Sequence, residues 1–222
     1  MKLQPIPPST PLGLAMNSTR RTFISASTLG GLALALRPEV SHAGGQLEEP
    51  MVDSVRSALS SAVNNSAPPI PEFNDTESRL KYIAWRTAMS DRLAKKKTDF
   101  QTRQEFLQTV WYESKRAGID TTMVMGLITV ESNFRKYAVS RVGARGYMQI
   151  MPFWVRVIGD GDASKLFHMQ TNIRFGCVIL RHYLERERGD TFLALGRYNG
   201  SRGKAEYPNA VNAAKRQWEW QG

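Results

Sequence analysis

Apolar residues recur at helical spacing along most of the chain from residue 76 to residue 218, and no stretch alternates with the period of a β-strand. Asp120 has the position of an N-cap, and Gly118 ends the helix before it. The pattern predicts helices over residues 76–93, 102–116, 121–132, 151–158, 172–187, 191–198 and 208–218, with irregular chain over 135–147. We therefore expect a mainly α protein with a single domain at residues 76–222.

The helix predicted over residues 121–132 is apolar on nearly every side, which is typical of a helix inside the core. Glu131 follows Leu127 and Ile128 by four and three residues, so it shares their face of the helix. Burial disfavours a charged carboxylate, and the partial negative charge of the helix C-terminus acts in the same direction. Both effects predict that Glu131 keeps its proton near neutral pH, as a general acid requires.

Residues 1–43 have the features of an export signal. Arg20 and Arg21 precede the weakly apolar run 24–36, and residues 41–43, Ser-His-Ala, have the small-x-small form of a cleavage site. The run is shorter than the roughly 20 apolar residues that span a bilayer. The paired arginines resemble a twin-arginine signal, with an ordinary secretory signal and a buried N-terminal helix as alternatives. We expect a periplasmic protein without a lipoprotein anchor, because no cysteine lies near the cleavage site.

Residues 44–75 are predicted to form a linker. Residues 51–62 have the pattern of a short amphipathic helix, which the asparagines and prolines of 64–71 end. The three lysines at 95–97 predict a solvated turn.

Positive charge predominates in the chain, which carries 30 basic and 20 acidic side chains. Residues 1–43 hold Lys2, Arg20, Arg21, Arg37 and Glu39, so 26 basic and 19 acidic side chains remain in the rest. Such a surplus favours a polyanionic neighbour, and we expect peripheral association with the cell envelope. Export argues against nucleic acid as a partner.

The remaining residue types point to neither a metal nor a cofactor. The three histidines lack ligand spacing, and Asp160 and Asp162 have the form of a solvated turn. Cys177, the only cysteine, lies in an apolar run and is predicted to be a buried structural thiol. No feature of the sequence points to a particular oligomeric state.

Three ordered motifs between about residues 119 and 211 resemble the soluble lytic transglycosylases of bacterial cell walls. They are Glu131-Ser132-Asn133-Phe134 with Ala138-Val139-Ser140 and Gly143-Ala144, then Gly146-Tyr147-Met148-Gln149-Ile150-Met151-Pro152, and Tyr198-Asn199-Gly200. The chain departs from the family at Tyr147, where Leu is more usual, and at Gly200, which follows Asn199 without an intervening Ala. The resemblance implies a lysozyme-like fold and non-hydrolytic cleavage of the MurNAc–GlcNAc β-1,4 bond in peptidoglycan glycan strands.

That reaction needs one acid where most glycosidases use a pair of carboxylates, about 5–5.5 Å apart when retaining and 6.5–9.5 Å when inverting. As the resemblance implies, the N-acetyl group of the substrate stabilises the oxocarbenium-like centre, and its own 6-hydroxyl closes a 1,6-anhydro ring. Glu131 would first protonate the leaving oxygen and then take the proton of that hydroxyl.

Other residues of the motifs are candidates for substrate binding. Gln149 offers a donor and an acceptor to an uncharged sugar, and Tyr198 is a candidate to orient Glu131 or the acetamido group through its hydroxyl. Ser132 has a helix-cap role as its alternative, and Asn199 a turn. The full set is Ser132, Ser140, Gly146, Met148, Gln149, Tyr198 and Asn199.

Two rival functions stay open at this point. A hydrolytic muramidase would need a second carboxylate, for which Asp160 and Asp162 are the nearby candidates. A non-catalytic peptidoglycan-binding protein would keep the cleft and lose the cleavage.

Overall fold

The computed structural model describes residues 45–64 and 69–221 of the chain, and the predicted export signal at residues 1–43 lies outside these residues. Within the described ranges the structure is helical and contains no β-strand, so the expected mainly α class is confirmed. None of the helices in these ranges is both long and apolar enough to cross a membrane. The elements are α1 (Asp53–Asn64), α2 (Thr76–Leu93), α3 (Phe100–Arg116), α4 (Thr121–Ser132), α5 (Pro152–Ile158), η1 (Ala163–Phe167, a 3-10 helix), α6 (Met169–Arg186), α7 (Thr191–Asn199) and α8 (Glu206–Arg216).

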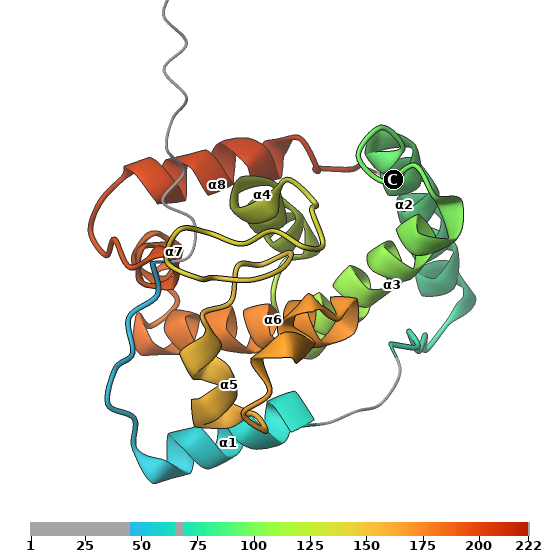
Figure 1. The fold of residues 1–222 in the computed structure, drawn as a ribbon. Helices are drawn as coiled ribbons and strands as arrows, with labels where there is room; N and C mark the ends of the chain where they lie inside the picture. The colour runs from blue at the N-terminus through green and yellow to red at the C-terminus, as the bar shows by residue number, and fades with distance from the viewer. Residues whose placement is uncertain (1–44, 65–68, 222) are drawn as a thin grey trace, which may run out of the picture. The chain divides into compact units, whose positions relative to one another are not determined.

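Helix α4 is the core helix that the sequence predicts, and it packs against α3 and α8 (Figure 1). The side chain of Asp120 accepts a hydrogen bond from the Thr122 N–H at 2.9 Å and so caps its first turn. Gly126 permits the close approach of α8, because a Cβ at this position would lie 2.8 Å from the Cα of Lys215. This close approach places Tyr207, in the first turn of α8, beside Glu131 in the last turn of α4.

Helices α3, α6 and α8 begin two or three residues earlier than the prediction. Helix α3 begins at Phe100 because the side chain of Asp99 accepts a hydrogen bond from the Thr102 N–H at 2.7 Å. Helix α8 begins at Glu206 and has Pro208 in its first turn, where proline fits because a first-turn N–H has no partner inside the helix.

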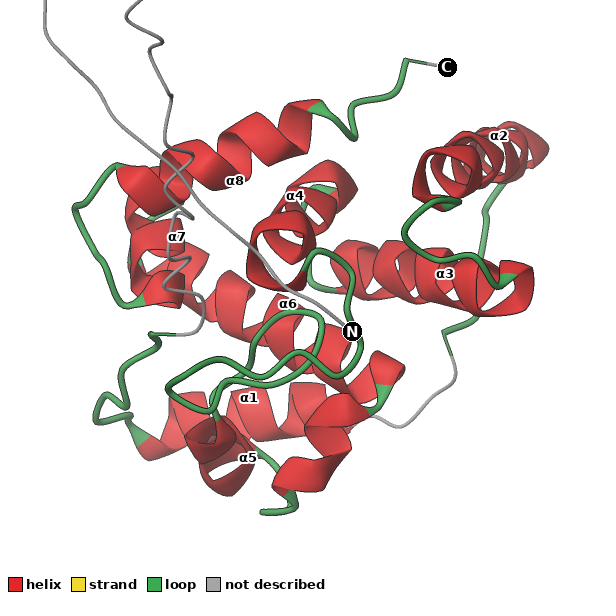
Figure 2. Ribbon diagram, turned by 45° about the horizontal axis from the view of Figure 1, so that its top comes forward, coloured by secondary structure: helices red, strands yellow, loops and turns green. Residues whose placement is uncertain are grey.

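The N-terminal part of the predicted linker packs on the helical domain instead of forming a tether. Helix α1 lies against α5 and α6 (Figure 2). Gln46 is only 3% exposed, and its amide accepts a hydrogen bond from the Met151 N–H at 3.2 Å and donates one to the Gln149 carbonyl at 3.4 Å. Residues 45–64 therefore belong to the domain, and the linker expected over 44–75 is corrected for this stretch.

A buried ion-pair network joins α3 and α6. The fully buried carboxylate of Glu113 lies 2.9 Å from both the Arg116 and the Arg174 guanidinium. Arg116 also donates a hydrogen bond to the Ala62 carbonyl near the end of α1, at 2.8 Å. Removing one partner of a buried network leaves buried charge uncompensated, so this network fixes how the three helices pack.

Candidate active site

Glu131 lies in the last turn of α4 and is 5% exposed. Its Oε1 accepts a hydrogen bond from the hydroxyl of Tyr207 at 2.5 Å, whereas its Oε2 has no hydrogen-bond partner among the described residues. Burial raises the pKa of Glu131 to about 8, against the smaller lowering effect of the Tyr207 hydrogen bond. The carboxyl group is therefore protonated at neutral pH, and its second oxygen is buried without a hydrogen bond among the described residues.

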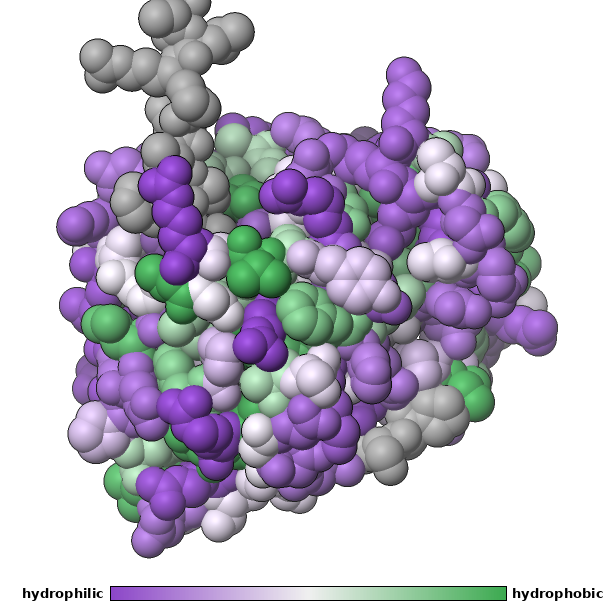
Figure 3. All heavy atoms as spheres, in the orientation of Figure 1, coloured by the Kyte–Doolittle hydropathy of each residue, from purple (hydrophilic) through white to green (hydrophobic). Residues whose placement is uncertain are grey.

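The loop between α4 and α5 runs across the face of the molecule seen in Figure 1. It starts with two residues in the left-handed region, Asn133 (φ 48°) and Phe134 (φ 65°), which turn the chain sharply away from the helix. On the same face, Figure 3 shows a mostly polar surface interrupted by apolar patches. Tyr137, Val139 and Val142 of this loop are 59–70% exposed, so the loop presents apolar side chains at the surface.

Two lysines of the 95–97 run hold this loop from the end of α2; the run forms a turn with Lys95 and Lys96 exposed, as expected, whereas Lys97 is partly buried. Lys96 donates a hydrogen bond to the side chain of Asn133. Lys97 donates one to the Tyr147 hydroxyl at 2.6 Å, and its ammonium lies 4.9 Å and 4.5 Å from the ring centres of Phe106 and Tyr147. Burial lowers the pKa of Lys97 to about 8. The tyrosine that departs from the family pattern thus has a partner for its hydroxyl.

The side chain of Gln149 forms hydrogen bonds to the backbone of the loop between α4 and α5. Gln149 is 1% exposed, its backbone has φ 48°, and its amide donates to the carbonyls of Ala138 and Gly146 at 3.1 Å and 2.9 Å. Glycine is required at 146, because φ is 77° and a Cβ would lie 2.3 Å from the Asn172 amide nitrogen. The side-chain amide of Asn172, which the sequence motifs did not include, donates to the Arg145 carbonyl and accepts from the Met148 N–H, both at 2.8 Å.

Three further candidates support the loop and the helix end in the structure. Ser132 donates to the Ile128 carbonyl at 3.3 Å, Ser140 accepts from the Ala144 N–H at 3.0 Å, and Met148 is fully buried. Their contact with substrate stays a prediction.

Tyr198 does not reach Glu131. Its fully buried hydroxyl donates to the Met148 carbonyl at 2.8 Å, so the hydroxyl that holds the acid is that of Tyr207 in the first turn of α8. The sequence contained a signal for Tyr207, because it shares a buried helical face with Val211 and Ala214, four and seven residues on. Starting the helix at residue 208 placed Tyr207 outside that pattern.

Asn199 follows Tyr198 at the end of α7 and is 7% exposed. Its amide nitrogen donates to the Ser201 hydroxyl at 2.9 Å, while its Oδ1 is buried without a hydrogen-bond partner among the described residues. A buried acceptor in this state is expected to be satisfied by a ligand or by water.

Asp160 and Asp162 interact with residues of their own turn, and Cys177 is buried. Asp162 accepts hydrogen bonds from the N–H and hydroxyl of Ser164, and Asp160 pairs with Lys165, in the exposed turn that the sequence predicts. Cys177 is buried, as predicted, and burial raises the pKa of its thiol.

Comparison with known families matches residues 108–221 to the transglycosylase SLT domain. The chain belongs to this family. The match contains Glu131, Gln149, Tyr198 and Tyr207, and the resemblance drawn from the motifs is confirmed.

The curated relatives are transglycosylases, and each match covers only part of the relative. Membrane-bound lytic murein transglycosylase C of Haemophilus ducreyi is 35% identical over 85 residues, which are 35% of this chain and 23% of the relative. The transglycosylase of Enterobacteria phage PRD1 is 31% identical over 103 residues, or 46% of this chain and 37% of the relative. The chain thus spans well under half of the length of these relatives. A solved inactive mutant of the lytic transglycosylase Slt from Pseudomonas aeruginosa is 20% identical, with a TM-score of 0.41 over 78% of this chain and 36% of that one.

Proposed function

We propose that this chain is a peptidoglycan lytic transglycosylase that cleaves the MurNAc–GlcNAc β-1,4 bond without water. The observation that carries the proposal is the carboxyl of Glu131, which is buried, has its pKa raised to about 8, and is held through one oxygen by Tyr207. Membership of the SLT family and the names of the relatives support the same substrate and reaction.

In the first step the protonated Glu131 donates its proton from Oε2, the oxygen that has no partner, to the oxygen bridging the two sugars. The bond between C1 of MurNAc and this oxygen breaks, and its electron pair stays with the leaving GlcNAc. The N-acetyl group of the substrate stabilises the resulting positive charge at C1.

In the second step the carboxylate of Glu131 takes the proton of the substrate's 6-hydroxyl, and O6 bonds to C1 to give the 1,6-anhydro ring. The proton that Glu131 lost is thus restored, and no water is consumed. The Tyr207 hydroxyl stabilises the ionised carboxylate between the steps, because a hydrogen bond to the charged form favours that form. One side chain performs both proton transfers.

Among the seven motif residues we propose Ser132, Ser140, Gly146, Gln149 and Asn199 for substrate binding, and Met148 and Tyr198 for support of the loop around them. Asn199 has the most direct support, because its buried Oδ1 lacks a partner among the described residues and can accept from a sugar N–H or O–H. Tyr198 and Met148 are fully buried, so we assign them contacts that support the loop which carries Gln149.

We further propose that the chain acts in the periplasm on glycan strands, with peripheral association with the envelope. The net charge of +10 supports an anionic neighbour, and residues 1–43 support export.

The substitution Glu131→Gln tests the proposal, because glutamine keeps the acceptor for the Tyr207 hydroxyl and cannot donate an acidic proton. We expect the variant to bind purified sacculi like the parent and to lose their clearance by a factor of at least about 100. Equal clearance by the variant would show that another group is the acid. If the parent binds sacculi and does not clear them, the chain is a binding module.

A further inference from the structure

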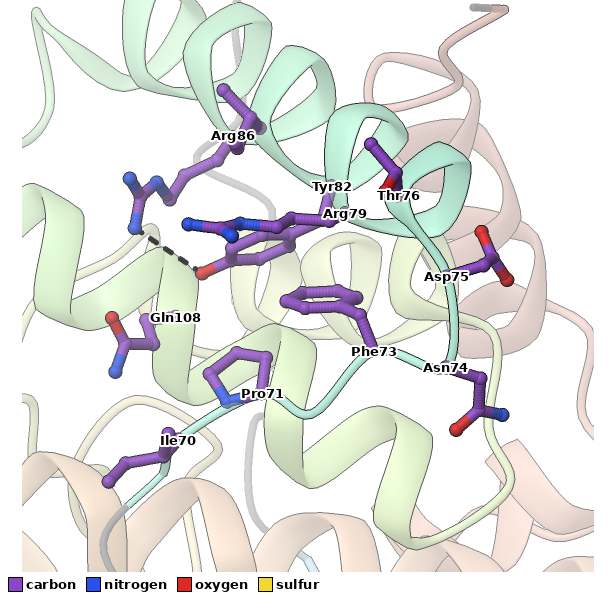
Figure 4. Close-up of a pocket in the computed structure, with 11 residues that line it drawn as sticks. Ile70, Pro71, Phe73, Asn74, Asp75, Thr76, Arg79, Tyr82, Arg86 and Gln108 are labelled. Carbon is purple, nitrogen blue, oxygen red and sulfur yellow. Dashed lines mark hydrogen bonds between the residues drawn. The ribbon is translucent and has the colours of Figure 1, made fainter.

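A ligand-sized groove lies mostly in the part of the chain that precedes the family match. It has a volume of about 650 Å³, within the range of known ligand sites, and is formed by residues 70–76 with α2 and α3. Its lining consists of Ile70, Pro71, Phe73, Asn74, Asp75, Thr76, Arg79, Tyr82, Ile83, Arg86 and Gln108 (Figure 4). Only Gln108 falls within residues 108–221, and no residue of the three sequence motifs contributes, so this groove is distinct from the Glu131 site.

Aromatic rings make up one wall of the groove. The ring of Phe73 lies 5.1 Å from that of Tyr82, which in turn lies 5.1 Å from the ring of Trp111 in α3. Pro71 lies beside Phe73 in the segment before α2, and Ile70 lies at the edge of the groove, as Figure 4 shows. The rings are fixed by packing, so the groove presents rigid apolar surface next to solvent.

Two guanidinium groups border the same groove. Arg79 and Arg86 lie seven residues apart on α2, on the face that also carries Tyr82 and Ile83. Figure 4 shows both extending over the Tyr82 side of the groove. Arg86 lies 5.3 Å from the ring centre of Tyr82, with its Nη1 3.5 Å from the hydroxyl.

The positive charge of this pair is not compensated within the described residues, where neither arginine lies within 4.0 Å of a carboxylate. The one acid in the lining, Asp75, is already engaged, because its two oxygens accept from the N–H and the hydroxyl of Ser78 at 2.6 Å and 2.9 Å. The groove therefore offers two planar cations beside an apolar wall.

We propose that this groove binds the acidic stem peptide of peptidoglycan. Guanidinium groups pair with carboxylates through parallel hydrogen bonds, while the aromatic and proline surfaces suit short aliphatic side chains. An uncharged sugar would leave both cations without a counter-charge. The proposal rests on the proposed function for the identity of the substrate, and it gives the segment before the family match a role in holding the peptides of the wall.

The test is calorimetric titration of the full chain with a synthetic stem tetrapeptide that has free carboxylates, and with the same peptide amidated. Neither peptide contains a glycosidic bond, so binding is measured apart from cleavage. We expect Arg79→Gln and Arg86→Gln each to weaken binding of the free peptide on the order of tenfold, and amidation to do the same. Lys81→Gln is the matched control, because Lys81 lies on α2 outside the lining and pairs with Glu77.

Two results would overturn the proposal. One is no measurable binding of the free peptide by a parent chain that clears sacculi, which would leave the proposed function intact. The other is equal binding of the free and amidated peptides, or equal loss in Lys81→Gln and the two arginine variants. Peptide binding by a parent chain that never clears sacculi would instead support the groove and contradict the proposed enzyme activity.

Discussion

Replacing Glu131 with glutamine is expected to change how the stability of the chain depends on pH. In the folded chain the pKa of Glu131 is raised to about 8, whereas the ordinary value of 4.5 applies after unfolding. Between these values the folded chain holds a proton that the unfolded chain has released, so the free energy of unfolding falls as the pH rises. At about 1.4 kcal/mol per pH unit, the difference between 4.5 and about 8 corresponds to about 5 kcal/mol.

Glutamine does not ionise, so the free energy of unfolding of the variant does not fall in this way as the pH rises. We expect the difference in unfolding free energy between variant and parent to grow in favour of the variant by up to about 5 kcal/mol between pH 4.5 and pH 9. Urea unfolding followed by tryptophan fluorescence at several pH values measures this difference. Glu105→Gln, which removes an exposed acid from α3, is the control and is expected to show far less change. A constant difference between Glu131→Gln and the parent across this pH range would refute the burial argument.

Three further substitutions test the contact to the acid, the support of the loop and the packing of the helices. Tyr207→Phe is expected to raise the pKa of Glu131 further and to move the alkaline limb of the kcat/KM profile to higher pH, with kcat lower by about 10- to 100-fold; an unmoved limb would contradict this. Gln46→Ala removes two hydrogen bonds to the loop backbone and should lower kcat more than KM, whereas Leu47→Ala, at a side chain 62% exposed, should leave both unchanged. Glu113→Ala should cost about 3–5 kcal/mol of unfolding free energy, measured in urea, since its two arginines lose a shared partner; a loss under about 1 kcal/mol would show that the network is unimportant.

The sequence predicts the elements and the acid well because both depend on local patterns. Aspartate caps and helical periodicity locate most of the helices within a few residues, as at Asp120 before α4. The burial of Glu131 follows from its place on an apolar helix face, which needs no knowledge of the other elements.

The partners of the site could not be predicted in the same way, because they come from distant parts of the chain. Tyr207 lies 76 residues from Glu131, and Gln46 lies 103 residues from the Gln149 carbonyl that it contacts. Lys97 looked like part of a solvated turn because its burial depends on two rings, those of Phe106 and Tyr147, contributed by other segments. Such contacts depend on tertiary packing, which a single sequence does not reveal.

The chemical identity of the sugar ends released from purified sacculi tests the central claim most directly. If one buried acid performs both proton transfers, mass spectrometry will find MurNAc ends in the 1,6-anhydro form, and Glu131→Gln will release few or none. Reducing MurNAc ends, each heavier by one water molecule, would show that water attacks the sugar and would contradict the single-acid mechanism.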